Sequence, residues 1–176
     1  MTTTLSTALE KTIQQYFTSI GTKTAATLLH IHPDYTILAY GTGKPELYWL
    51  LEIGFETTAN LFFKHNPPTP GEVENAIQTV EDEVMALRKL LPNESTLFTI
   101  DQPIRNIAKQ QISTTNTEGL VLSRSSMEQI FGRLAAIISG RPASSDTLPT
   151  DNNFAATLLI LREVMHHLKF TEIHCF

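Results

Sequence analysis

The stretch TLLHIHPDYTIL, residues 27–38, decides the fold, because it holds two apolar runs separated by a short polar break. Ala25–Ile31 and Tyr35–Tyr40 are apolar and of strand length, and a Pro-Asp pair lies between them. Such runs, bounded by turn residues, indicate β-strands. The glycine-rich turn Gly41–Pro45 leads into a third apolar run, Leu47–Ile53, so the sequence predicts a three-stranded meander.

The rest of the chain alternates between helical and strand patterns. Apolar residues at three- and four-residue spacing predict helices at 5–20, 55–64, 70–91, 101–111, 123–138 and 154–168. Further strands are expected at 95–100 and 171–176. A meander followed by strand–helix crossovers favours an α/β fold with a five-stranded mixed sheet and helices on both faces. We expect an N-terminal amphipathic helix in residues 1–22 and a single domain in residues 23–176.

Local patterns also indicate where two of the helices begin and which way they face. Thr69, Pro70 and Glu72 have the pattern of a capping box with proline at the first helical position, so a helix should begin here. The acids of this helix, Glu81 among them, are expected to form its solvated face. The apolar stripe of the first helix, which includes Ile13 and Phe17, is expected to cover the chain's own sheet or, alternatively, to pair with a second copy.

Composition excludes several classes of protein. With 176 residues, 41% of them hydrophobic, the chain suits one globular domain. A net charge of −5 and scattered basic residues argue against nucleic-acid binding. The single cysteine, Cys175, allows no internal disulfide and fits a reducing compartment. No secretory leader and no long apolar run are recognisable, so we expect a cytoplasmic protein without a membrane span.

His30 and His32 lie two residues apart at the end of the first strand, so both imidazoles should face the same side. With an oxygen ligand from Asp34 they form a candidate metal site. The competing interpretation is that these are polar residues where a strand leaves the core. A further imidazole would come from His166, His167 or His174.

Four stretches, in this order of elements, carry a resemblance to a known family. They are LLEIGFETTANLFFKHNPPTPGEVENAI (50–77), STLFTIDQPIRNIAKQ (95–110), GLVLSRSSMEQIFGRLAAI (119–137) and LPTDNNFAATLLILREVMHHLKFTEIHCF (148–176). Residues 25–176 thereby resemble the C-terminal half of the exopolyphosphatase and guanosine-pentaphosphate phosphohydrolase family, of the actin, Hsp70 and sugar-kinase superfold. The resemblance implies a ribonuclease-H-like (actin-like ATPase) domain.

The resemblance places the opening stretch at the family's first phosphate loop, which reads Asp-Ile-Gly-Gly-Gly-Ser-Thr-Glu. His30 stands at the metal-associated aspartate, and His32, Pro33 and Asp34 stand at the three glycines. Glycines let backbone N–H groups approach phosphate oxygens. Here a proline has no N–H to donate, and an acid repels phosphate. The sequence therefore predicts a degenerate loop.

The other positions implied by the resemblance have mostly lost the family's functional groups as well. Thr36 keeps the family's threonine, but Ile37 stands at the glutamate and has no group to activate water. The second phosphate turn, Gly-Thr-Gly-Gly-Thr in the family, reads Thr99–Pro103 and places Asp101 and Gln102 at glycine positions. Where the family has Arg-Ala-Asp, residues 150–152 read Thr-Asp-Asn, so the basic side chain is missing.

In the family, phosphate chemistry lies in a cleft between two similar halves, and this chain resembles one half. We therefore expect a non-catalytic interaction or regulatory module, with a protein partner or a second copy as its ligand and no cofactor. The alternative is a remodelled phosphohydrolase for polyphosphate or guanosine pentaphosphate, completed by a dimer or a partner chain. It would use Mg²⁺ or another divalent ion held by His30, His32, Asp34 and Asp101. A third possibility is phosphate or nucleotide binding without hydrolysis.

Overall fold

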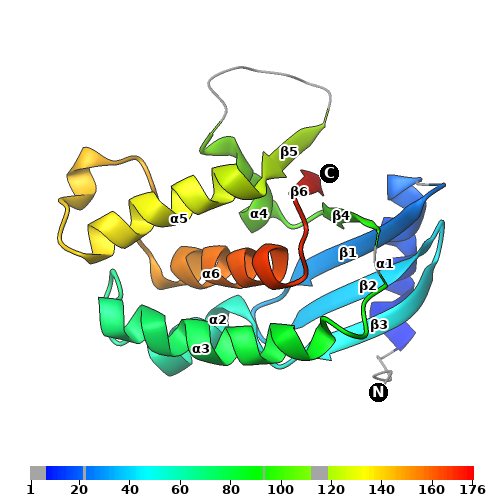
Figure 1. Cartoon of the computed structure of the whole chain (residues 1–176), viewed down its shortest axis with the longest axis horizontal. Helices are drawn as coiled ribbons and strands as arrows, with labels where there is room; N and C mark the ends of the chain where they lie inside the picture. The colour runs from blue at the N-terminus through cyan, green and yellow to red at the C-terminus, as the bar shows by residue number, and fades with distance from the viewer. Residues whose placement is uncertain (1–6, 22, 93, 112–118) are drawn as a thin grey trace.

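The computed structural model describes residues 7–21, 23–92, 94–111 and 119–176, in which helices and strands alternate after an initial meander (Figure 1). The elements are α1 (Thr7–Ile20), β1 (Ala25–Ile31), β2 (Thr36–Thr42), β3 (Pro45–Leu51), α2 (Phe55–Phe62), α3 (Pro70–Leu87), β4 (Thr96–Thr99), α4 (Gln102–Lys109), β5 (Leu120–Ser123), α5 (Arg124–Ile138), a short 3-10 helix (Ala143–Ser145), α6 (Asn152–His167) and β6 (Glu172–Cys175).

One mixed sheet organises the chain, with the strand order β3-β2-β1-β4-β6-β5. The central strands β1, β4 and β6 are parallel to one another, whereas β2, β3 and β5 pair antiparallel with their neighbours. At the centre, Leu28 of β1 lies between Ala39 of β2 and Phe98 of β4. The predicted α/β class and mixed sheet are confirmed.

The prediction of five strands was wrong, because the described residues form a sheet of six. The additional strand, β5, is only four residues long and pairs antiparallel with β6 at the edge of the sheet. It runs directly into α5, whose N-cap is Ser123: the Ser123 hydroxyl accepts a hydrogen bond from the Ser126 amide at 3.1 Å. No turn residue separates the strand from the helix, so the sequence pattern shows only the helix start.

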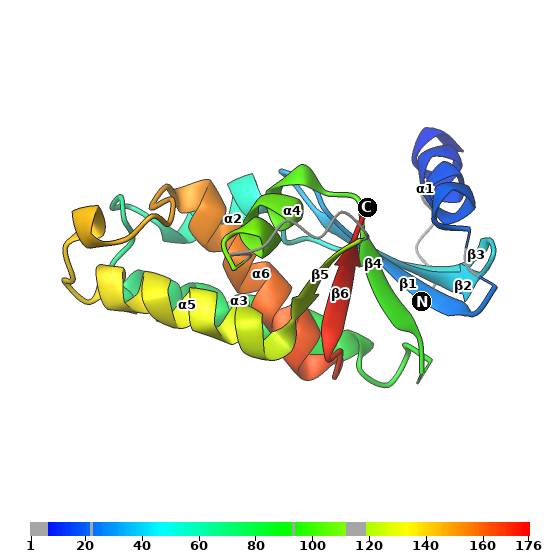
Figure 2. The ribbon, with the colours of Figure 1, turned by 90° about the horizontal axis from the view of Figure 1, so that it is seen from above.

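Helices cover both faces of the sheet, as expected. The larger core lies between the sheet and α2, α3, α5 and α6, with α6 in the middle of these helices (Figure 1). Most residues of α6 are buried. The smaller core lies on the opposite face, where Ile13 and Phe17 of α1 pack on Leu28, Ile37 and Phe98. Figure 2 shows α1 standing over the β1–β3 part of the sheet. The first helix therefore packs on the chain's own sheet.

The predicted start of α3 is confirmed. The Thr69 hydroxyl accepts from the Glu72 amide at 3.4 Å, and the Glu72 carboxylate accepts from the Thr69 amide at 2.7 Å. Pro70 occupies the first helical position, where its missing N–H costs nothing. In the part of the chain that the structure describes, no helix has the length and apolar character needed to span a bilayer.

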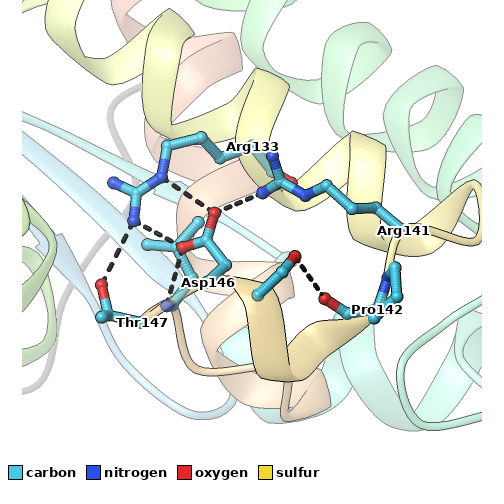
Figure 3. A network of polar contacts seen from close by, with 7 residues as sticks. Arg133, Arg141, Pro142, Asp146 and Thr147 are labelled. Atoms are coloured by element: carbon cyan, nitrogen blue, oxygen red, sulfur yellow. Dashed lines mark hydrogen bonds and ion pairs between the residues drawn. The ribbon is translucent and has the colours of Figure 1, made fainter.

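In the connection from α5 to α6, the carboxylate of Asp146 accepts several hydrogen bonds, which Figure 3 shows. Arg133 donates to both carboxylate oxygens, at 2.5 and 3.2 Å, and Arg141 donates to the same carboxylate. The Leu148 amide adds a bond at 3.1 Å. The hydrogen bonds from Arg133 hold the pKa of Asp146 well below its usual range. These contacts anchor the loop to α5.

Candidate functional site

The carboxyl ends of the parallel strands β1, β4 and β6 meet at one edge of the sheet, which is where open α/β sheets bind ligands. His30 and Ile31 end β1, Asp101 follows β4, and Cys175 ends β6. Both stretches that the sequence marks as degenerate phosphate turns therefore lie at this edge.

Asp101 joins the two turns through its carboxylate. Oδ1 lies 2.6 Å from Nδ1 of His30, and Oδ2 accepts from the backbone N–H of Ile31 at 2.6 Å. The Asp101 amide donates to the Thr99 hydroxyl at 3.0 Å, which fixes the turn. Asp101 is only 7% exposed, so these short bonds form in a low-dielectric environment where they are strong.

Tyr16 of α1 covers the imidazole of this pair. Its ring meets the His30 ring edge-on, with centroids 6.5 Å apart. Burial, together with the nearby Asp101 carboxylate, raises the pKa of Tyr16 above its usual value. The phenol therefore stays neutral over the physiological range, and the first helix takes part in closing this edge of the sheet.

The loop from β1 to β2 is stabilised by hydrogen bonds and a ring stack between its own residues. The His32 amide donates to the Tyr35 carbonyl at 2.8 Å, and the His32 ring stacks on the Tyr35 ring with centroids 4.3 Å apart. The Asp34 amide donates to Nδ1 of His32 at 3.3 Å. The side chain of Asp34 points to solvent, and its carboxylate lies 3.7 Å from the His32 ring nitrogen.

The same loop caps the N-terminus of α2. The Phe55 amide donates to the His32 carbonyl at 3.1 Å, and the Glu56 and Thr57 amides donate to the Pro33 carbonyl at 2.9 and 3.1 Å. This approach requires glycine at position 54, because a Cβ there would lie 2.2 Å from the Pro33 carbonyl oxygen. Helix N-termini attract anions through their free N–H groups, and here backbone carbonyls occupy three of them.

The side chains at the remaining predicted positions do not join the contact between Asp101 and His30. The Thr36 hydroxyl donates to the Ile53 carbonyl at 2.6 Å inside the fold. Ile37 is buried under α1, and the exposed Gln102 side chain donates to Asn106 at 2.8 Å. The structure thus brings together His30 and Asp101, and leaves Thr36, Ile37 and Gln102 in structural roles.

The candidate metal ligands His30, His32 and Asp34 do not converge. Nδ1 of His30 is engaged by Asp101, and the rings of His30 and His32 are 6.0 Å apart in an edge arrangement. Among the described residues, three potential ligand atoms come close together in a different place, at Glu81, Glu163 and His167. Cys175 is buried, and burial raises the pKa of its thiol to about 11, so the reactive thiolate is rare at neutral pH.

The mixed six-stranded sheet with helices on both faces has the actin-like ATPase fold. Among solved structures, the chain is similar to an Aquifex aeolicus member of the Ppx/GppA protein family, with TM-score 0.76 and 17% identity over 94% of this chain and 57% of that one. It is similar to the type II variant of the Aquifex aeolicus Ppx/GppA phosphatase, with TM-score 0.74 and 17% identity over 93% and 56%.

An exopolyphosphatase from Cytophaga hutchinsonii matches with TM-score 0.72 and 13% identity over 96% of this chain and 59% of that one. The likeness predicted from the sequence is therefore confirmed as a likeness of fold, and the chain spans between 56% and 59% of these three structures. No family model matches the sequence. No curated protein matches it either.

Proposed function

We propose that this chain is a non-catalytic relative of the exopolyphosphatases that acts as an interaction or regulatory module. The observation that supports this most directly is that the chain itself occupies the donors at the strand edge. The Asp101 carboxylate takes the Ile31 N–H and the His30 ring nitrogen, and the carbonyls of His32 and Pro33 take three N–H groups of α2.

An incoming phosphate would have to displace these contacts. Moving the buried Asp101 carboxylate would cost free energy, because its charge would be left without the two short hydrogen bonds that it now accepts. Asp101 and Asp34 also place negative charge beside the edge, which disfavours an anion. This supports the absence of phosphate binding as well as the absence of turnover.

One observation favours the alternative, a remodelled phosphohydrolase. A carboxylate bonded to Nδ1 orients an imidazole so that Nε2 is available as a base, which is how histidine is held in many hydrolases. The Tyr16 ring beside His30 argues against it, because it restricts access from the α1 side. We therefore keep hydrolysis, with Mg²⁺ and a site completed by a second chain, as the competing outcome of the test.

The decisive assay measures phosphate release from polyphosphate and guanosine pentaphosphate with Mg²⁺, at high protein concentration. We expect no release above background, and no change of melting temperature with either compound. The variant His30→Gln removes the candidate base, and Gln102→Ala is a matched surface control at the same edge. Turnover that is lost in His30→Gln and kept in Gln102→Ala would overturn the proposal and support the alternative.

The partner in this proposal is a protein, and a second copy of the chain is the first candidate. The sheet face that α1 covers over β1–β3 carries exposed apolar side chains beyond β4: Val121 is 42% and Phe176 47% exposed, and Phe176 packs beside Phe98. Among the described strands, β5 is also at the edge of the sheet, and edge strands offer backbone groups for pairing with another chain. Sedimentation equilibrium should show self-association that Val121→Lys weakens. A monomer at every concentration would contradict self-association.

A further inference from the structure

Three potential metal ligands meet between two helices far from the strand edge. Glu163 and His167 lie one turn apart on α6, and Glu81 faces them from α3, which packs alongside α6 (Figure 1). Nε2 of His167 lies 3.0 Å from Oε2 of Glu163 and 3.5 Å from Oε1 of Glu81. One ligand atom from each of the three lies within 4.8 Å of the other two.

The charges around this cluster do not balance. Glu163 is 1% exposed, and Arg162 donates to its Oε1 at 2.6 Å. The same guanidinium donates to Glu128 at 3.0 Å. Three carboxylates (Glu81, Glu128, Glu163) and one guanidinium leave two negative charges while His167 is neutral. A buried carboxylate beside a second carboxylate is unfavourable unless a cation joins them.

The geometry suits a small divalent cation. Zinc bonds nitrogen and oxygen at about 2.0–2.2 Å, so two ligands of a tetrahedral ion lie about 3.4 Å apart. The distances from the His167 nitrogen to the two carboxylates, 3.0 and 3.5 Å, bracket that separation. Two ligands at positions i and i+4 of one helix face the same side, as in helical zinc sites. One oxygen of each carboxylate lies within 4.8 Å of the other and of the imidazole nitrogen.

His167 lies beside a pocket and at a helix end. The pocket, of about 610 Å³, lies at the ends of α3 and α6, and its lining also includes Arg88, Lys89 and Lys169. His167 is also the last residue of α6, and the C-terminus of a helix carries partial negative charge that favours a cation. Arg162 holds one oxygen of Glu163 and leaves the other directed at His167.

We propose that Glu81, Glu163 and His167 form a binding site for a divalent transition-metal ion of the Zn²⁺ class. One imidazole and two carboxylates suit Zn²⁺, Co²⁺ or Mn²⁺ better than Mg²⁺, which prefers an all-oxygen shell and keeps its waters. The site shares no residue with the strand edge, so it does not depend on the function proposed above. The competing arrangement is a protonated His167 that pairs with both carboxylates and needs no metal.

The test titrates chelator-stripped full-length protein with Zn²⁺, Co²⁺ and Mg²⁺ at mildly alkaline pH, where imidazole is neutral. We expect saturable Zn²⁺ binding, Co²⁺ absorption bands typical of four or five ligands, and a rise in melting temperature of about 5 °C. Mg²⁺ should produce no comparable rise.

Variants then connect binding to these side chains. Glu81→Gln keeps the fold, because Glu81 is partly exposed, and it should weaken Zn²⁺ at least about tenfold. His167→Ala should abolish the Co²⁺ bands. His166→Ala is the matched control, since His166 is exposed on the same turn and outside the cluster, and it should bind like wild type. Absent Zn²⁺ binding, or equal binding by wild type and Glu81→Gln, would overturn the proposal.

Discussion

Two buried carboxylate–imidazole pairs of the described chain differ in the other groups that contact them. At the strand edge, Asp101 lies 2.6 Å from His30, and its second oxygen accepts the Ile31 backbone N–H. Between α3 and α6, Glu163 lies 3.0 Å from His167, but the imidazole faces a second carboxylate, Glu81, at 3.5 Å. In both pairs the second carboxylate oxygen accepts a further hydrogen bond, from the Ile31 N–H in the first pair and from Arg162 at 2.6 Å in the second. The pairs differ at the imidazole, because His167 also faces a second carboxylate.

This difference decides whether the charges of each pair are satisfied within the chain or can accept a further ligand. At the strand edge one carboxylate meets one imidazole and one backbone N–H, so the Asp101 pair is satisfied and binds two turns of the fold to each other. Between α3 and α6 two carboxylates share one imidazole, and this excess of negative charge is what the proposed metal ion would offset. The residue types alone do not distinguish the two outcomes.

The largest expected effect comes from the residue that lets the strand-edge loop approach α2. Gly54→Ala should lower the free energy of unfolding by about 4 kcal/mol, because the new Cβ would lie 2.2 Å from the Pro33 carbonyl oxygen. Gly132→Ala in α5 is the control: nothing lies within 4 Å of its Cβ, and it should gain about 0.5 kcal/mol. Urea denaturation measures both. Equal stability of the two variants would show that the loop does not close against α2.

Substitutions at Asp101 and Glu81 contrast the two pairs directly. Asp101→Asn should cost about 2 kcal/mol, because the amide presents a donor to a site built from donors. Glu81→Gln, in metal-free protein, should cost nothing measurable, since it relieves repulsion between two carboxylates. Chemical denaturation of both variants under the same conditions gives the comparison. A similar loss of unfolding free energy in both variants would show that the two pairs do not differ in this way.

Thr36→Val tests whether the threonine that ends the strand-edge loop has a structural role. Its hydroxyl donates to the Ile53 carbonyl at 2.6 Å in the interior, so the isosteric valine should cost about 1 kcal/mol. Thr57→Val, at a part-buried hydroxyl that contacts Gly54, provides a neighbouring reference. An unchanged unfolding midpoint in Thr36→Val would point to a role outside stability.

A third carboxylate–imidazole pair, Glu72–His65, lies at the surface with 2.9 Å between Nδ1 and Oε1, and its effect should be the smallest. The Thr69 backbone N–H, with help from His65, lowers the pKa of Glu72 from 4.5 to about 2. Because the folded-state pKa is depressed, the stabilisation is present above pH 4.5 and is lost as pH falls toward 2.

Melting temperatures across this acid range should fall less steeply in Glu72→Gln than in wild type. The acid Glu74, on the exposed side of the same helix, provides the control variant Glu74→Gln. If both variants show the wild-type slope, the depressed pKa of Glu72 does not contribute to acid stability.

Local patterns predicted much of the fold. The strands around residues 27–38, the capping box at Thr69 and the helix start at Ser123 all rest on contacts between residues close in sequence. β5 escaped prediction because it is only four residues long and no turn residue separates it from α5. The likeness to phosphate turns placed His30 and Asp101 at one edge, but the sequence did not show that they bond to each other.

The sequence by itself determined the α/β class, the meander, and the loss of glycines and gain of acids at two turns, because these depend on periodicity and residue type. Only the tertiary structure decided what the new side chains do. Asp101 reaches a backbone N–H across the sheet, and Glu81, which the helical pattern assigns to a solvated face, meets His167 of another helix. Both outcomes depend on groups brought together from distant parts of the chain, and the energy of a carboxylate is set by those neighbours.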